Sequence, residues 1–225
     1  MRKPPATTPY GPVAAVYDAF LTFTGFKRGV ERFLNRVDFA VPNNGRILDA
    51  GCGTGLLSFY FARRFPTARV VATDIDPAML RELAELRDKQ KLPVERLRIG
   101  ESDLGNPAVV RFLNASQSTM LPHRSFDAIV VSGALEHVAL NAAVARLAGL
   151  LKPGGTFFNL GMRRSPVGAA LGMIYRYRPY RIADMRNAAI NAGLSDVRVI
   201  RLGAEDFPAN LSRVAMLARK AAPLR

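Results

Sequence analysis

The sequence is poor in the residues that support redox and metal chemistry. Its 225 residues include one cysteine, two histidines and no tryptophan. A single cysteine excludes an intrachain disulfide, and Cys52 has no neighbouring histidine or second cysteine to activate a thiolate, so a small filler role is predicted for it. No apolar run of about 18 residues and no signal or lipidation motif occurs, which predicts a cytoplasmic protein without a transmembrane helix.

Acidic residues are also scarce relative to basic ones. The chain has 18 Asp and Glu against 32 Lys and Arg, giving a net charge of +14, and 26 of the basic residues are arginine. Such a surface attracts phosphates, whether of nucleic acid or of anionic lipid head groups. Arginine richness can equally reflect genomic base composition. The segment 163–186 is especially uneven, with six arginines and one acid.

The most informative pattern is a glycine-rich turn followed by a distant acid. The apolar run 47–50 leads into three alternate glycines, Gly51, Gly53 and Gly55, and Asp74 ends a second apolar run. Glycine permits the tight strand-to-helix turn and lets a ligand approach the backbone. A carboxylate about twenty residues further on can accept hydrogen bonds from both ribose hydroxyls. The pair of signals predicts a nucleotide-type cofactor site.

The spacing of the turn separates two cofactor classes. A dinucleotide fingerprint requires a third small residue where this chain has the bulky Leu56. The turn instead resembles motif I of the class I S-adenosylmethionine-dependent methyltransferases, Asp-x-Gly-x-Gly-x-Gly, beginning at Asp49. The segments 73–80, 121–131 and 150–157 resemble later motifs of that family in the family's order. The chain is most similar to its quinone and lipid small-molecule branch.

The resemblance implies the residues that contact S-adenosylmethionine and its product S-adenosylhomocysteine. It assigns the ribose to Asp74 and adenine packing to Ile75. The family's usual Asp-Ala pair, which holds the adenine amino group, is replaced by Asn114-Ala115, and Asp103 lies too far upstream for the usual spacing. The predicted cofactor-binding residues are Asp49, Gly51, Cys52, Gly53, Gly55, Asp74, Ile75, Met79, Asn114, Ala115 and Ser132.

Alternation of strands and helices predicts an α/β fold. The order is strand 46–49, helix 56–64, strand 69–73 and helix 77–89, with Asp76 as the helix N-cap. The third strand lies in 97–99 or in 109–113, and the stretch between them is an insertion. Strands at 128–131, 156–160, 197–201 and 214–218, with a helix at 182–192, complete one doubly wound, mostly parallel, seven-stranded domain. Its parts are a helical cap (1–44), the cofactor-binding core (45–160) and a substrate-covering insertion with the last helix and strands (161–225).

Candidate catalytic residues are few. His137 follows the fourth strand, where the resemblance places a histidine in quinone-type enzymes, and it could serve as a general base toward a hydroxyl acceptor. Tyr17, in the helical cap, could hydrogen-bond the acceptor. A first-turn histidine can equally be structural, and tyrosines on an apolar lid are often packing residues. No metal site is predicted, because Ser132 and Gly133 stand where metal-dependent relatives carry a carboxylate.

The sequence leaves the class of methyl acceptor open. Apolar and aromatic residues interleaved with arginines in 161–181 favour a lipophilic small molecule, a quinone precursor or a phospholipid head group, taken up at an anionic membrane surface. The same arginines could track RNA phosphates, although no base-methylating motif follows the fourth strand. A third alternative is a non-catalytic S-adenosylmethionine-binding scaffold.

Overall fold

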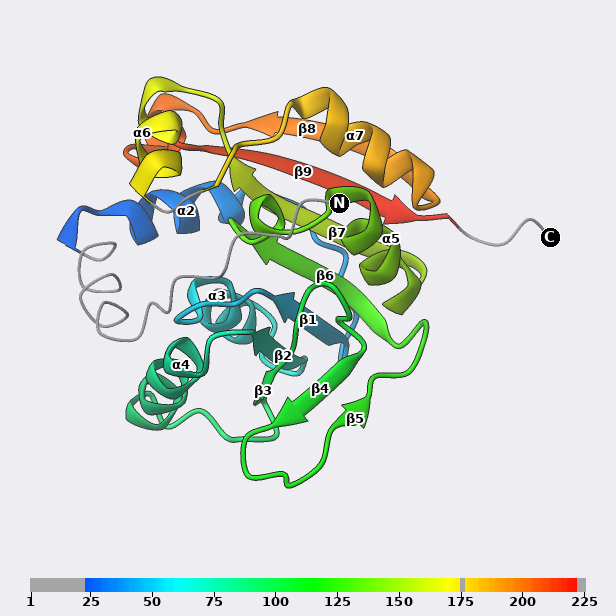
Figure 1. Ribbon diagram of the computed structural model, residues 1–225. Helices are drawn as coiled ribbons and strands as arrows, with labels where there is room; N and C mark the ends of the chain where they lie inside the picture. The colour runs from blue at the N-terminus through cyan, green and yellow to red at the C-terminus, as the bar shows by residue number, and fades with distance from the viewer. Residues whose placement is uncertain (1–22, 175–176, 222–225) are drawn as a thin grey trace.

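Nine strands form one sheet in the computed structural model, which describes residues 23–174 and 177–221 (Figure 1). The strand order is β5-β4-β3-β2-β1-β6-β7-β9-β8. Five neighbouring strands run parallel: β3 (Leu97–Glu101), β2 (Arg69–Asp74), β1 (Arg46–Ala50), β6 (Phe126–Ser132) and β7 (Leu151–Met162). The chain order reverses between β1 and β6, and ligands of open α/β sheets bind at such a reversal, outside the carboxyl ends of the strands.

An antiparallel hairpin forms one edge of the sheet. β9 (Arg213–Lys220) lies between β7 and β8 (Leu194–Arg201) and runs opposite to both. These two strands and the five parallel ones are the seven that the sequence predicts. The helix expected at 182–192 is α7 (Ile182–Asn191), which ends before Gly193 at φ 74°.

Two further strands extend the opposite edge. β4 (Val109–Phe112) pairs antiparallel with β3, and the short β5 (Thr119–Met120) pairs with β4. Both segments left open as the third strand are therefore strands, and only 97–101 is the parallel one. The stretch between them is the turn that reverses the chain into β4.

Helices cover both faces of the sheet, each over its own apolar core. On one face lie α2 (Phe26–Asn35), α3 (Leu56–Arg64) and α4 (Pro77–Lys89), whose inward residues pack on β1, β2 and β7. On the other lie α5 (Leu140–Leu150) and α7, which pack against each other and on β6 and β9. The expected N-cap is confirmed, since the Asp76 carboxylate accepts the N–H of Ala78 at 2.8 Å, just after Pro77.

The connection between β8 and β9, residues 202–212, contacts two distant segments. It contains the short turns η3 (Ala204–Asp206) and η4 (Ala209–Leu211). Arg36, just after α2, pairs with the buried Asp206 at 2.7 Å. A Cβ on Gly29 would lie 2.4 Å from the Asp206 carbonyl oxygen, so only glycine allows α2 to approach this closely. Ser165, just before α6 (Pro166–Ile174), donates to the Leu211 carbonyl.

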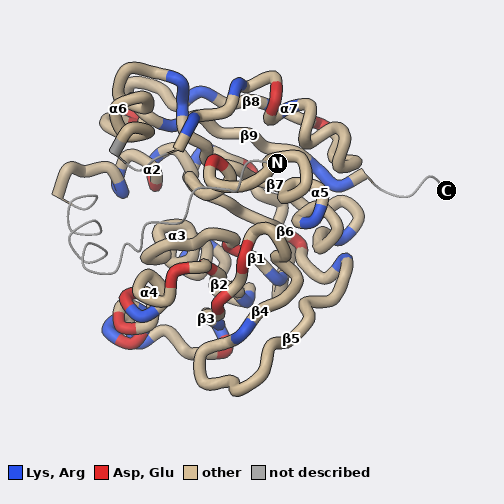
Figure 2. Tube along the Cα trace, viewed as in Figure 1, with Lys and Arg blue, Asp and Glu red and all other residues tan. Residues whose placement is uncertain are grey.

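Charge is distributed unevenly over the fold (Figure 2). Acidic and basic residues are mixed around β2, β3 and α4, whereas basic residues outnumber acidic ones in the described part of the stretch from α6 into α7. Among the helices of the described ranges, none is long and apolar enough to cross a bilayer.

Candidate functional site

The turns that follow β1, β2, β3 and β6 meet at the carboxyl edge of the parallel strands. The turn after β1 is tied to β2, because the backbone N–H groups of Gly51 and Cys52 both donate to the Thr73 carbonyl, at 2.7 and 2.9 Å. Ser102, after β3, donates its N–H to the Asp74 carbonyl at 3.0 Å. The sequence signals that lie far apart along the chain therefore share one edge.

The three glycines of the turn lack a side chain for two different reasons. All three adopt left-handed conformations, with φ of 71°, 53° and 93° for Gly51, Gly53 and Gly55. A Cβ on Gly51 would lie 2.3 Å from the Cβ of Ala134, and one on Gly55 would lie 2.3 Å from a methyl of Leu83. A Cβ on Gly53 would meet nothing within 4 Å. Gly51 and Gly55 therefore allow protein packing, whereas Gly53 leaves open space above the backbone.

Asp74 joins the glycine turn to the turn after β2. Its Oδ2 accepts the Gly53 N–H at 2.8 Å and its Oδ1 accepts the Asp76 N–H at 3.0 Å. Burial raises the pKa of Asp74, and these backbone donors act in the opposite direction. A carboxylate has about four acceptor positions, so Asp74 can still accept from a hydroxyl group of a ligand. The geometry suits the ribose role that the resemblance implies.

Asp49 is buried beneath the turn, with 1% of its surface exposed. Its Oδ2 accepts the Ser58 hydroxyl at 2.6 Å, while its Oδ1 has no hydrogen-bond partner. Burial raises the pKa of Asp49 to about 7, and the nearby charge of Asp74 adds to the increase. An unpartnered buried acceptor is costly unless a ligand donor or water satisfies it. This orphaned oxygen is therefore suited to an ammonium group.

The remaining predicted contacts around the turn differ in accessibility. Ile75 is 45% exposed immediately after Asp74, so its side chain offers an apolar surface to a planar base. Met79 is buried in the first turn of α4. Burial, with the charges of Asp74 and Asp49, raises the pKa of the Cys52 thiol, which therefore stays protonated. A small filler role agrees with that environment.

Asn114 and Ala115 do not lie at this edge. β4 runs antiparallel to β3, with Phe112 opposite Gly100, and the Leu113 N–H donates to the Ile99 carbonyl at 2.9 Å. The chain therefore moves away from the carboxyl edge as it approaches Asn114, which is exposed and left-handed at φ 70°. Asn114 would lie at this edge only if β4 ran parallel to β3. The residues that do leave β3 at the edge are 102–104.

The end of β6 carries the predicted Ser132 and His137. Ser132 pairs with Leu160 of β7, and His137 closes the short turn η2 (Leu135–His137). Its ring lies 5.6 Å from the Tyr177 ring, edge to face. Burial lowers the pKa of His137, partly offset by the Glu136 and Asp74 carboxylates, so the imidazole is neutral at pH 7. Tyr17 lies outside the described residues.

Glu136, beside His137, is a buried acid that is absent from the predicted site residues. It is 7% exposed, and its Oε1 accepts the Met162 N–H at 2.6 Å. Its Oε2 has no partner, and neither has the Oδ1 of the fully buried Asn159. Nothing in the local pattern distinguishes Glu136 from a solvated acid in a first helical turn. Its burial depends on the approach of β7.

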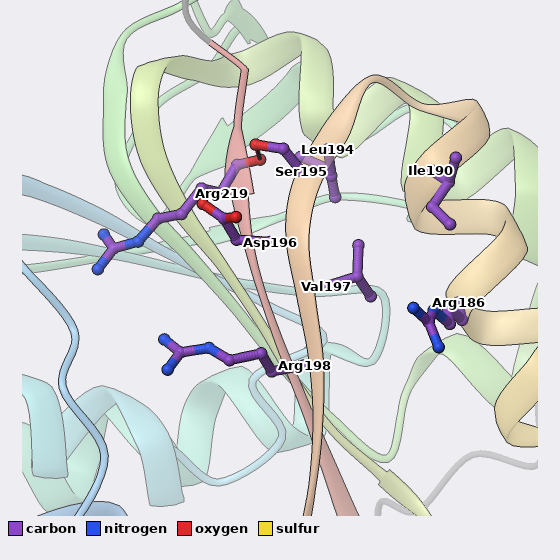
Figure 3. A pocket seen from close by; sticks show the side chains of 8 residues that line it. All are labelled: Arg186, Ile190, Leu194, Ser195, Asp196, Val197, Arg198 and Arg219. Carbon is purple, nitrogen blue, oxygen red and sulfur yellow. Dashed lines mark hydrogen bonds between the residues drawn. The ribbon is translucent and has the colours of Figure 1, made fainter.

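A surface hollow elsewhere does not belong to this edge (Figure 3). It lies between α7 and the β8–β9 hairpin and contains three arginines. Arg198 and Arg219 extend from the hairpin away from α7, whereas Arg186 extends from α7 itself. Arg219 also donates to Thr156 at 2.5 Å. Because their guanidinium groups do not converge, the hollow is not a built anion site.

The part of the chain that carries the carboxyl edge is similar to known methyltransferases. Residues 48–157 match a family model described as a methyltransferase domain. An uncharacterised methyltransferase of Mycobacterium bovis is 38% identical over 112 residues, 49% of this chain and 47% of that protein. A demethylmenaquinone methyltransferase of Thermus thermophilus is 28% identical over 215 residues, 93% of this chain and 89% of that protein. The match therefore spans about half the length of the mycobacterial relative and most of the Thermus one.

A solved structure shows the same architecture. Geranyl diphosphate C-methyltransferase from Streptomyces coelicolor, in complex with Mg²⁺, geranyl diphosphate and S-adenosylhomocysteine, superposes with a TM-score of 0.69. It is 13% identical, and the match covers 96% of this chain and 86% of that one. The chain therefore has the fold of the class I methyltransferases, and residues 48–157 are similar to a methyltransferase domain.

Proposed function

We propose that the chain binds S-adenosylmethionine at the carboxyl edge of β1 and β2 and transfers its methyl group to a lipophilic small molecule. The observation that carries the cofactor assignment is the open space over Gly53, beside the accepting carboxylate of Asp74. Asp74 would take the ribose hydroxyls and Ile75 one face of the adenine. The unpartnered oxygen of Asp49 would receive the methionine ammonium. The bound cofactor would fill the open space over Gly53, cover the exposed Ile75 side chain and satisfy the orphaned Asp49 oxygen.

The adenine amino group requires a different partner from Asn114. Residues 102–104 leave β3 beside Asp74, and the Leu104 side chain would lie 3.5 Å from a Cβ on Gly51. Asp103 is exposed, and one of its carboxylate oxygens accepts the Gly105 N–H at 2.7 Å. Asp103 is therefore proposed to accept the adenine amino hydrogen bond.

The protein contributes mainly alignment and the handling of one proton. Bound S-adenosylmethionine supplies an electrophilic methyl group on sulfur. The acceptor atom must be held in line with that group in a site from which water is excluded, and such positioning accounts for much of the acceleration. A hydroxyl acceptor would lose its proton as its oxygen bonded to the methyl carbon, while the carbon–sulfur bond broke and S-adenosylhomocysteine left. His137, neutral at pH 7 because burial lowers its pKa, can accept that proton.

Exposed apolar side chains support a lipophilic acceptor taken from a membrane surface. Met173 and Val167 of α6 are 79% and 40% exposed, and Phe207 in the connection that holds α6 is 60% exposed. Exposed arginines, among them Arg163 and Arg164, precede α6. Apolar residues bordered by cations suit an anionic bilayer. The name of the Thermus relative, a demethylmenaquinone methyltransferase, supports a quinone precursor as acceptor, with a phospholipid head group as the other candidate.

Two experiments test the acceptor and the membrane separately. Incubation with labelled S-adenosylmethionine and fractionated cell extract should place label in the organic phase. Sedimentation should occur with anionic and not with neutral liposomes, and Met173→Glu should weaken it, whereas Val94→Glu, at an exposed position in the connection between α4 and β3, should not. Label in aqueous fractions alone would contradict the lipophilic acceptor. Equal sedimentation with both liposome types would contradict the membrane surface.

The net charge of +14 favours one alternative acceptor, RNA. Label in extracted RNA, together with tight and steeply salt-dependent binding of transfer or ribosomal RNA, would establish it. Binding of S-adenosylmethionine without transfer to any fraction would instead support the non-catalytic scaffold.

A further inference from the structure

Arg213, the first residue of β9, is a buried cation without a carboxylate partner among the described residues. Its exposed fraction is 8%. Of the ion pairs found in residues 23–174 and 177–221, none involves it, and its Nε has no hydrogen-bond partner. A buried guanidinium is costly to desolvate unless an anion and hydrogen-bond acceptors compensate for the loss of water.

The groups that surround Arg213 are soft and apolar. Met162 stands opposite it in the β7–β9 ladder, and the thioether sulfur of Met162 accepts from Nη1. The Phe26 ring of α2 lies with its centroid 5.3 Å from the guanidinium carbon. Sulfur is a weak acceptor, and an aromatic face attracts a cation without neutralising it. Within the described part of the chain these contacts orient the guanidinium, and no carboxylate pairs with its charge.

The guanidinium lies at the cofactor edge. A Cβ on Gly133, just after β6, would stand 2.6 Å from Nη1 and 3.4 Å from Nη2 of Arg213. The next residue, Ala134, packs against Gly51 of the glycine turn, where a Cβ would come within 2.3 Å. A continuous line of contact thus runs from Arg213 through 133–134 to the glycine turn. Only glycine at position 133, at φ 63°, permits it.

From this placement we infer that Arg213 is a carboxylate receptor at the methyl-transfer edge. Its planar fork of donors matches a carboxylate in bidentate geometry. Two ligands could supply the carboxylate: the methionine end of the cofactor, or an acidic group on the acceptor. Gly133 lies at the edge where the proposed function places both ligands. The inference rests on the proposed function, because that function places these ligands at this edge.

The test measures binding by Arg213→Met, which keeps an unbranched apolar stem and removes the guanidinium with its charge, and by Arg213→Lys, which retains a charge. Arg198→Met, at an exposed position on β8, is the matched control. Calorimetry compares S-adenosylhomocysteine, which has a methionine-type carboxylate, with 5′-methylthioadenosine, which lacks the amino-acid part. Thermal unfolding reports whether benzoate, a simple carboxylate probe, stabilises the protein with and without saturating S-adenosylhomocysteine.

If the cofactor supplies the carboxylate, Arg213→Met binds S-adenosylhomocysteine about tenfold to a hundredfold more weakly and 5′-methylthioadenosine equally well, and Arg213→Lys recovers part of the loss. If the acceptor supplies it, S-adenosylhomocysteine affinity is unchanged, while benzoate raises the Tm of the wild type and of Arg198→Met and not that of Arg213→Met. In both cases the Tm of the ligand-free Arg213→Met protein is unchanged or higher, because an unpaired buried charge is removed.

A lower ligand-free Tm with no change in either binding experiment would identify a structural arginine and overturn the inference. Failure of the wild type to bind either nucleoside is a different outcome, since it would overturn the proposed cofactor site. The benzoate measurement without nucleoside would then still decide the role of Arg213.

Discussion

Replacing Gly53 by alanine distinguishes a glycine required by the backbone conformation from one required by the space of a ligand. Gly53 adopts φ 53°, and a Cβ there would meet no protein atom within 4 Å. Gly154 is its match at the opposite end of the sheet, with φ 75° and equally open space. An L-residue in the left-handed region costs about 1–2 kcal/mol, so both alanine variants should lose that much unfolding free energy. Neither variant gains a clash.

The two variants should differ in ligand binding alone. If S-adenosylmethionine lies against the backbone at Gly53, a methyl group at that position occupies the space of the ligand. We expect Gly53→Ala to bind S-adenosylhomocysteine at least about tenfold more weakly, equivalent to about 1.4 kcal/mol, while Gly154→Ala binds like the wild type. Isothermal titration calorimetry measures the affinity, and urea unfolding measures the common stability cost.

The refuting result is specific. If Gly53→Ala retains wild-type affinity and shows only the stability loss of Gly154→Ala, the open space over Gly53 is not the cofactor position. A stability loss far larger than that of Gly154→Ala would mean that Gly53 serves protein packing, like Gly51 and Gly55. Either outcome would remove the observation that carries the cofactor assignment.

Three further predictions concern charged groups of the site. The pKa of Asp49 is about 7 in the folded protein against an ordinary 3.8. The protonated Asp49 therefore stabilises the fold fully below about pH 4, and this contribution is lost as the pH rises through 7. The loss of unfolding free energy amounts to about 4 kcal/mol. Asp49→Asn should remove that part of the dependence in urea unfolding of the ligand-free protein, and parallel pH curves would contradict the pKa. Asp74→Ala should weaken the binding of both S-adenosylhomocysteine and 5′-methylthioadenosine. It should also lower the unfolding free energy by about 1–3 kcal/mol, because the N–H groups of Gly53 and Asp76 lose their acceptor. Unchanged affinity would show that the ribose assignment is wrong. His137→Gln should lower kcat with a hydroxyl acceptor and remove the acid limb of the pH–rate profile, which in the wild type lies below the ordinary histidine pKa; an unaltered profile would leave His137 a structural residue.

The sequence predicts the cofactor edge well because its signals are local. The three glycines, the distance to Asp74 and the N-cap at Asp76 depend on backbone conformation within a few residues. The seven-strand core follows from apolar runs separated by turns. These features therefore appear in the structure with nearly the predicted bounds.

The position of Asn114 and the burial of two charged residues depend on tertiary contacts, which local sequence patterns do not show. The direction of β4 is set by the turn after β3, so the position of Asn114 could not be obtained from motif spacing. Glu136 and Arg213 are charged residues whose burial results from β7, β9 and α2 packing around them. A local pattern predicts such residues to be solvated, since charged groups are rarely buried without partners.

The connection between β8 and β9 has a consequence for how acceptor choice can change. It contacts Arg36 next to α2 and Ser165 next to α6, so two helical segments that are far apart in sequence are joined through a third segment. None of these contacts involves the glycine turn or Asp74. If α2 and α6 cover the proposed acceptor site, substitutions in 202–211 would shift both helices together without touching the glycine turn or Asp74. Acceptor preference could then change separately from the binding of the proposed cofactor.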